Sequence, residues 1–482
     1  MVVILSHFES RARPTGWLTV SIAACALGFL PFVKAYGEPL ETALVKAYQN
    51  NPVLNSQRAA VRAADEGVPQ ALSGYRPRIS ITATAGEQSL SSTSREVGST
   101  VPLNSPATYF SQSGFNAPYG AGLTATQTLF NGFQTENRTR QAESQVLAAR
   151  ETLRLTEQAV MMNAVTAYMN LLRDDAVLYL QRRNVEVLKE QLRQTRDRFN
   201  VSEVTRTDVA QAEASLAAGR SQVLLAQANY TASLATYRQV IGNEPGKLSP
   251  ASPVDRFSPH GLSQAINLGT TANPGVTTAQ YNVDAADRQV RIAEGALYPT
   301  LSLQGNVQKN YMTGLDTTES YSASLLGQLV VPIYQGGAEY SLVRQAKETL
   351  GQKRIDLDIA RDQVRQNVVQ SWGQLDAAKA NIEATKAQVQ SSEIALNGVR
   401  EEARLGQRTT LDVLNAQQTL VNARVALVTA QHDRVVASYQ LLASVGRLSI
   451  QVLGLRVPVY DAQVHYHQVR DSWAGLRTPD GR

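Results

Sequence analysis

One stretch that the chain contains twice decides the fold. Residues 205–220 read TRTDVAQAEASLAAGR, and residues 409–424 read TTLDVLNAQQTLVNAR. Thr, Asp, Val, Ala, Leu and Arg recur at the same places, at an offset of 204 positions. An aspartate at the start of a helix accepts backbone N–H bonds at the positive end of the helix dipole, so we expect Asp208 and Asp412 to be N-caps.

The duplication extends upstream of these helices. Residues 129–143, LFNGFQTENRTRQAE, match residues 333–347, IYQGGAEYSLVRQAK, at the same offset. Further upstream an NP pair recurs, but there Pro52 matches Pro274 at an offset of 222. The chain therefore contains an internal duplication, and its first copy is longer by 18 residues before position 129.

The N-terminus has the pattern of an export signal. Arg11 and Arg13 precede the uncharged apolar run GWLTVSIAACALGFLPFV, and the small residues of AYGE follow it. We expect cleavage near Gly37. The alternatives are a membrane anchor, for which the run is short and is broken by Pro31, and a lipoprotein with a lipidated Cys25, the chain's one cysteine.

Beyond the signal, no apolar run is long enough to cross a membrane as a helix. An exported chain of this kind is expected in the periplasm, outside the cell, or in an outer-membrane β-barrel. We divide the chain into a signal peptide, a first repeat, a linker segment, a second repeat and a C-terminal periplasmic tail: residues 1–37, 38–242, 243–270, 271–446 and 447–482.

Two long segments without proline indicate helical hairpins. No proline lies between Pro118 and Pro245 or between Pro332 and Pro458, and proline is not tolerated inside a regular helix. Small and apolar residues recur there at a spacing of three and four, as in a coiled-coil seam. The predicted arms cover 132–199 and 208–241 in the first copy, and 337–404 and 412–445 in the second.

Four segments of alternating polarity predict β-strands, at 78–88, 119–130, 300–309 and 321–333. Alternation over about ten residues is typical of a transmembrane strand. The polar segments 87–118 and 309–320 between them are expected to be loops. Four strands cannot close a barrel, and an open sheet edge cannot face lipid. The chain must therefore assemble, to eight, twelve or sixteen strands.

Nothing in the sequence indicates catalysis or a cofactor. GxxxxGK[ST], HExxH, GxSxG and Cys/His clusters are all missing. His465 and His467 form one candidate metal pair, but we expect them to lie in a solvated tail. The net charge of +5 is too small an excess to indicate binding of nucleic acid.

The chain resembles the TolC-type family of outer-membrane efflux channels. The resemblance rests on the NP openings, on YP before the second strand pair, on LFNGF and PIYQGG, and on the tips VTRTDVAQAEA and GQRTTLDVLNAQ. It implies a mixed α+β membrane protein: a homotrimer with one twelve-stranded β-barrel in outer-membrane lipid and a long α-helical coiled-coil tunnel in the periplasm. It also implies docking to a periplasmic adaptor (membrane fusion) protein and to an inner-membrane ABC or proton-driven pump.

The resemblance also places a gate at the hairpin tips. Thr207 and Asp208 of the first tip are expected to bind Arg408 of the second and to hold the aperture shut. The family's second restraint uses a tyrosine where this chain has Ala403. Asp412 supplies one acidic ring, whereas the position of a second ring is occupied by Asn415, so the mouth should hold three carboxylates.

Two functions from different classes fit the sequence. One is an export channel for type I protein secretion or small-molecule efflux. The other is a structural coiled-coil protein of the cell envelope without a pore. The matched strand pairs favour the channel.

Overall fold

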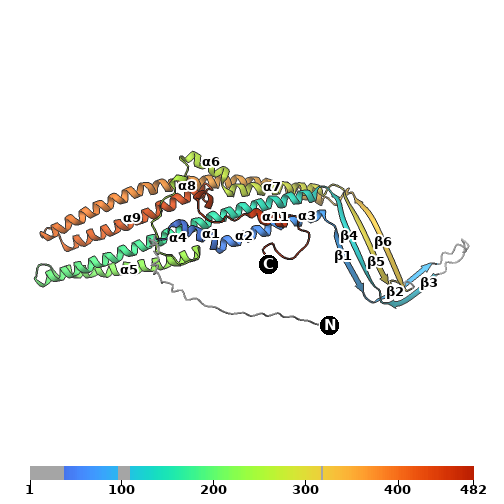
Figure 1. The fold of residues 1–482 in the computed structure, drawn as a ribbon, viewed down its shortest axis with the longest axis horizontal. Helices are drawn as coiled ribbons and strands as arrows, with labels where there is room; N and C mark the ends of the chain where they lie inside the picture. The colour runs from blue at the N-terminus through green and yellow to red at the C-terminus, as the bar shows by residue number, and fades with distance from the viewer. Residues whose placement is uncertain (1–36, 96–108, 316–317, 482) are drawn as a thin grey trace, which may run out of the picture.

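A computed structural model describes residues 37–95, 109–315 and 318–481. The expected signal peptide and Cys25 lie outside the described residues, apart from Gly37. The molecule is elongated, with a β-sheet at one end and the tips of two helical hairpins at the other (Figure 1). Within the described part of the chain, no helix is long and apolar enough to cross a membrane.

The sheet contains the four predicted strands in the order β1-β4-β5-β6, and every neighbouring pair is antiparallel. Leu123 of β4 pairs with Ile81 of β1 on one side and with Val307 of β5 on the other. In the described chain β1 and β6 have no partner on their outer edges. The strands are β1 (Arg78–Ala85), β4 (Tyr119–Asn131), β5 (Thr300–Tyr311) and β6 (Glu319–Val330).

The expectation of a loop over residues 87–118 was wrong for both ends of this range, while residues 96–108 lie outside the described residues. Strands β2 (Gln88–Arg95) and β3 (Tyr109–Asn116) pair there as an antiparallel ribbon that continues the chain beyond the four-stranded sheet (Figure 1). Their sequences, QSLSSTSR and YFSQSGFN, do not alternate between apolar and polar residues as a half-buried strand does. Backbone pairing and a few polar side-chain contacts, such as Thr93 with Ser111 at 3.2 Å, hold them, so their sequences carry no periodic strand signal.

Deletion of residues 92–112 should leave folding, assembly and conductance nearly unchanged. Ser92 pairs with Gln112, so this deletion removes equal lengths of both strands and closes the ribbon after the pair of Ser91 and Ser113. Exposed loop tips tolerate such changes. Loss of the assembled form on a native gel would contradict this placement of the ribbon outside the barrel.

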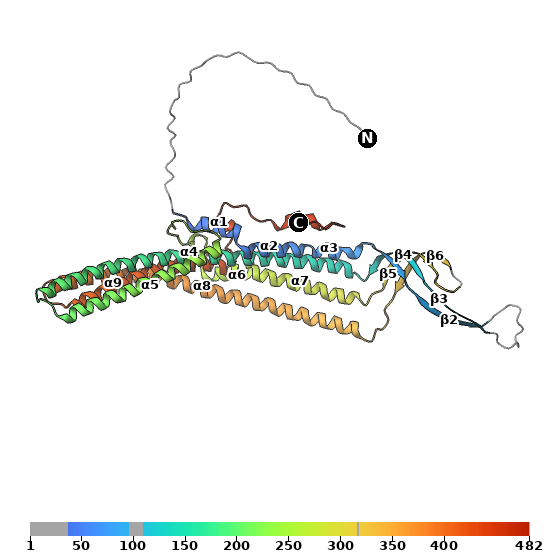
Figure 2. The ribbon, with the colours of Figure 1, turned by 90° about the horizontal axis from the view of Figure 1, so that it is seen from below.

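Four helices form the two hairpins. The descending helices α4 (Gln134–Asn200) and α8 (Ala338–Arg404) have 67 residues each, which is about 100 Å at about 1.5 Å per residue. The return helices are α5 (Arg206–Ile241) and α9 (Thr410–Ser444). Both hairpins end side by side at the same end of the molecule (Figures 1 and 2).

Small residues bring the arms of the first hairpin close together. A Cβ atom on Gly219 of α5 would lie 2.8 Å from Cδ1 of Leu188 in α4, so a larger residue there would require the Leu188 side chain to move. Ala212 and Leu216 are buried in the same cluster, which also includes Leu414 of α9. The predicted seam at a spacing of three and four is therefore the packing surface of α5, and it also contacts the second hairpin.

The largest hydrophobic core lies where the hairpins meet the short helices, and we call this level the waist. It contains the fully buried Tyr168 of α4, Tyr237 of α5 and Leu442 of α9. Helices around and above it are α1 (Leu40–Asn50), α2 (Pro52–Asp65), α3 (Gly67–Leu72), α6 (Leu262–Ala272) and α7 (Pro274–Gly295). Two single turns of 3-10 helix lie at η1 (Ser73–Tyr75) and η2 (Asp255–Phe257).

The C-terminal segment is packed against the helices, so the expectation that His465 is solvated was wrong. The segment contains α10 (Ile450–Leu453) and α11 (Ala462–Val469) and lies along α2 (Figure 2). Nδ1 of His465 lies 3.0 Å from Oδ2 of the fully buried Asp65, and Arg150 lies 3.8 Å from the other carboxylate oxygen. Burial raises the pKa of Asp65. His467, in contrast, is exposed.

Candidate gate at the helical tips

Both predicted tip aspartates lie at helix starts, but neither is the N-cap. The N-caps are Thr205 and Thr409, and each aspartate follows three residues later in a capping box. Oδ2 of Asp208 accepts the Thr205 backbone N–H at 2.9 Å, and Oδ2 of Asp412 accepts that of Thr409 at 3.0 Å. The spacing T-x-x-D is itself a capping signal, so the sequence could have given the correct start.

The capping bonds also set the charge of both carboxylates. Hydrogen bonds from the Thr205 side chain and backbone hold the pKa of Asp208 below its usual value. For Asp412, the backbone N–H of Thr409 is the largest cause of a lowered pKa, followed by the Thr409 hydroxyl. Arg408 adds the smallest of the favourable contributions, so one cation of the same chain lies near Asp412. Both carboxylates are therefore charged at neutral pH.

Within one chain, Arg408 binds a different acid from the one expected. Its Nε donates to Oε2 of Glu402 at 2.8 Å, and this bond is the largest cause of the raised pKa of Arg408. In the described chain no hydrogen bond or ion pair joins Arg408 to Thr207 or Asp208. The first tip contains the reversed pair, Arg198 with Glu203 at 2.6 Å.

The remaining predicted residues differ in exposure. Thr207 is exposed on the first turn of α5, Asn415 is exposed on the second turn of α9, and Asp412 is half-buried. Ala403 is buried and lines a groove of about 570 Å³ between α4 and the second tip. Its methyl group offers no hydroxyl, so no hydrogen bond of the tyrosine type can form there.

A polar bridge near the tips ties the two hairpins together, and the sequence analysis missed it. Arg400 of α8 donates to Oε1 of Gln417 in α9 at 3.0 Å, and Nε2 of Gln417 donates to Oδ1 of Asn184 in α4 at 3.2 Å. Arg196 and Glu213, one repeat earlier, bind each other at 2.5 Å. Arg196 and Glu213 are the counterparts of Arg400 and Gln417 at the offset of 204, so aligning the two copies would have revealed the bond between Arg400 and Gln417.

Nothing at the tips has the geometry of a catalytic or metal site. In the residues that the structure describes, no three His, Cys, Asp or Glu side chains converge as metal ligands would. The arrangement offers instead fixed charges at the ends of two long hairpins. Charges placed at a narrow opening select and retard ions, and they hold neighbouring elements together.

Comparison with known proteins gives one family. The sequence model described as "Outer membrane efflux protein" matches residues 43–243 and 266–447. Outer membrane efflux protein BepC of Brucella suis biovar 1 (strain 1330) is 44% identical over 449 residues, covering 93% of this chain and 94% of the relative. Outer membrane protein TolC of Escherichia coli (strain K12) is 28% identical over 429 residues, covering 85% and 83%.

A solved structure shows the same fold. The Campylobacter jejuni CmeC outer membrane channel has a TM-score of 0.72 at 18% identity, covering 90% of this chain and 89% of that one. The fold and the two tips thus define the class of outer-membrane channel proteins with a helical extension.

The chain belongs to the outer membrane efflux protein family. It is located in the outer membrane, where it acts as an exit duct for export and not as an enzyme.

Proposed function

We propose that the duct is a homotrimer with one twelve-stranded barrel. The free outer edges of β1 and β6 carry this proposal, because unpaired backbone groups cannot face lipid. Joining β6 of one copy to β1 of the next removes every edge. Large apolar side chains already point away from the sheet, with Ile81 at 78% and Leu325 at 72% exposure, as a lipid-facing surface requires.

The helices support the same assembly. In one chain α4 packs against both α5 and α9, and α9 packs against α8, so α5 and α8 are the outer members of the row. They expose apolar side chains, among them Leu224 on α5 and Ile359 on α8. Contact between α5 of one copy and α8 of the next closes a ring. An internal duplication accounts for the equal lengths of α4 and α8 and makes this ring pseudo-sixfold.

Native mass spectrometry in mild detergent should detect three copies of the mature chain. A β-barrel trimer is also expected to resist SDS until it is boiled. A monomer or dimer under gentle conditions would contradict the closed barrel and would favour a coiled-coil protein without a pore.

We further propose that the tips close the periplasmic end at rest. Among the described residues of its own chain, Arg408 forms a hydrogen bond with Glu402 and none with Thr207 or Asp208, so we expect the bond to Thr207 or Asp208 to form between copies. Glu402 then competes with Asp208 of the partner subunit for the same guanidinium. Three Asp412 carboxylates surround the axis, and the neutral Asn415 adds no second acidic ring.

The partners follow from the family. We propose that the periplasmic hairpins dock to an adaptor protein and, through it, to an inner-membrane ABC or proton-driven pump. The pump supplies the energy, and the duct is passive. The cargo is a small molecule or a protein of type I secretion. The Brucella relative is named an efflux protein, which supports the first class.

A further inference from the structure

We infer that Gln158 is a positioning residue of the gate: it fixes the angle at which α9 leaves the waist, and thereby the place of the second tip. The inference rests on the proposed function of the tips. It starts from the ends of the two return helices, where the last carbonyl groups of a helix have no partner inside the helix.

The end of α9 is closed by a backbone motif. Its C-cap region contains Gly446 at φ 83°, the backbone N–H of Gly446 donates to the Ala443 carbonyl at 2.9 Å, and that of Arg447 donates to the Leu442 carbonyl at 2.9 Å. This is the Schellman arrangement, which needs glycine at the left-handed position. A Cβ atom on Gly446 would also lie 2.7 Å from Cα of Asn273.

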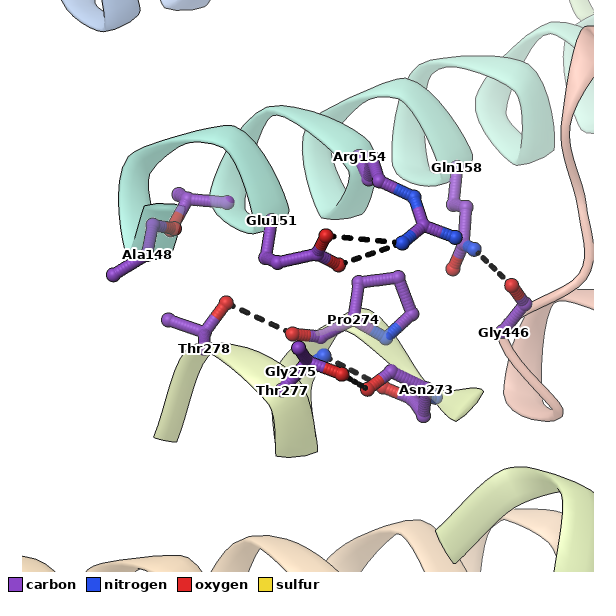
Figure 3. A network of polar contacts seen from close by, with 11 residues as sticks. Ala148, Glu151, Arg154, Gln158, Asn273, Pro274, Gly275, Thr277, Thr278 and Gly446 are labelled. Atoms are coloured by element: carbon purple, nitrogen blue, oxygen red, sulfur yellow. Dashed lines mark hydrogen bonds and ion pairs between the residues drawn. The ribbon is translucent and has the colours of Figure 1, made fainter. Parts of the chain in front are cut away.

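Two buried amide side chains then bind carbonyl groups at this helix end. Nδ2 of Asn273 donates to the Ser444 carbonyl at 3.0 Å, while its Oδ1 caps α7 by accepting the Gly275 N–H at 2.8 Å. Nε2 of Gln158 donates to the Gly446 carbonyl at 2.7 Å (Figure 3). Both side chains are only 7% exposed, so water cannot replace either bond without opening the waist.

The first repeat has one of these two links but not the other. Nδ2 of Asn51 donates to the Val240 carbonyl at 2.9 Å, as Asn273 does in the second repeat. The counterpart of Gln158 at the offset of 204 is Asp362, which is exposed and binds Arg365 at 3.0 Å on its own helix. The end of α9 is therefore tied to the first repeat through α4, whereas α5 has only the link within its own repeat.

Gln158 is also the upper end of a row of contacts between α4 and α9. Further toward the tips, Oδ1 of Asn170 lies 2.9 Å from Nε2 of His432, and Asn184 binds Gln417 at 3.2 Å. The Gln158 link is the one of the three that holds the helix at its end and not along its side. It therefore sets the direction of α9, and the other two hold α9 against α4 along that direction.

The length of α9 amplifies a small change at the waist. With 35 residues the helix is about 52 Å long, at about 1.5 Å per residue. A tilt of about 5° at Gly446 moves the far end by about 4 Å for a lever of that length. A displacement of this size exceeds a hydrogen-bond length and separates Arg408 from a partner in a neighbouring copy.

Spin labels at matched positions of the two tips test the inference. Gln418→Cys labels the exposed face of α9, and Ala214→Cys labels the equivalent exposed position of α5. Cys25 lies in the segment expected to be removed, so each label is unique in the mature full-length trimer. In Gln158→Leu, the distances between the 418 labels should shift by about 4 Å, and the distances between the 214 labels should not change.

Two further variants complete the experiment. Asp362→Leu, the same substitution at the counterpart position, should move neither label. Gln158→Met keeps the length of the side chain but has no donor for a carbonyl group, so it should repeat the shift, and it provides the test if Gln158→Leu does not assemble. Unchanged 418 distances in an intact trimer overturn the inference, as do equal shifts at both tips, which show a general loosening of the waist.

Conductance separates the inference from the gate on which it rests. If the tips form the gate, Gln158→Leu should also increase single-channel conductance in a lipid bilayer. A shift of the 418 labels without any change in conductance supports Gln158 as a positioning residue and counts against the tips as the gate.

Discussion

Asp412→Asn should raise the concentration of a divalent or trivalent cation needed to block the channel by about tenfold. Three copies of Asp412 are expected to crowd the axis, where they attract cations into a narrow mouth. The Thr409 bonds lower the pKa of Asp412, so its carboxylate is charged at neutral pH and cation block should fade only as the pH falls into the acid range.

Asparagine is the informative replacement because it keeps a side-chain oxygen that can accept the Thr409 N–H. Asp412→Ala removes both the charge and the capping acceptor, and should weaken block to the same extent while the trimer stays intact. Asn415→Asp restores the second acidic ring and should strengthen block. Bilayer recordings with Asp412→Asn that show unchanged block would mean that Asp412 only caps α9.

Arg408→Ser should increase single-channel conductance, because it removes an ion pair that is proposed to hold the tips shut. The increase should be on the order of threefold only, since exposed ion pairs are individually weak. The structure adds a second variant with the opposite sign. Glu402 binds Arg408 within the chain at 2.8 Å, so Glu402→Gln releases Arg408 for Asp208 of the partner subunit and should lower conductance.

Arg198→Ser is the matched control for both variants. It removes an arginine from the ion pair with Glu203 at the first tip and takes no direct part in the proposed bond between copies, although its charge lies near Asp208. Its effect on conductance should therefore be clearly smaller than that of Arg408→Ser. Planar bilayer recordings of the three variants at one salt concentration provide the measurement. If Arg198→Ser and Arg408→Ser had equal effects, the conductance would depend on the total charge at the mouth and not on a specific bond of Arg408.

Much of the fold could be predicted because local rules dominate it. A spacing of three and four, long segments without proline, and alternation over four strands placed the ends of the hairpin helices and of the paired strands within about four residues of those observed. The predicted start of α5 lies two residues too late because the prediction treats Asp208 as the N-cap. The observed N-cap is Thr205, three positions earlier. The T-x-x-D spacing of a capping box is present in the sequence, so the correct start could have been predicted.

The parts that could not be predicted depend on contacts between distant residues. The β2–β3 ribbon has no apolar face, so its strands leave no periodic signal. His465 is buried because α11 packs along α2, where it meets Asp65, which is 400 positions away in sequence. The contacts of the gate residues could not be predicted for a similar reason, because Arg408 and Asp208 do not meet within one chain. The sequence resemblance indicates the residues, while only the structure shows that Arg408 binds Glu402 within the chain.

The attachment of the C-terminal segment to α2 has a consequence for biogenesis. With the N-terminal export signal that the sequence predicts, Asp65 would cross the inner membrane early, and its partner His465 would follow only after nearly the whole polypeptide. Until then the nascent periplasmic chain carries an uncovered acid and the uncovered apolar surface of Val68 and Val146, against which Tyr466 later packs. The packing of α11 against α2 and α4 can therefore form only when translocation of the chain is nearly complete.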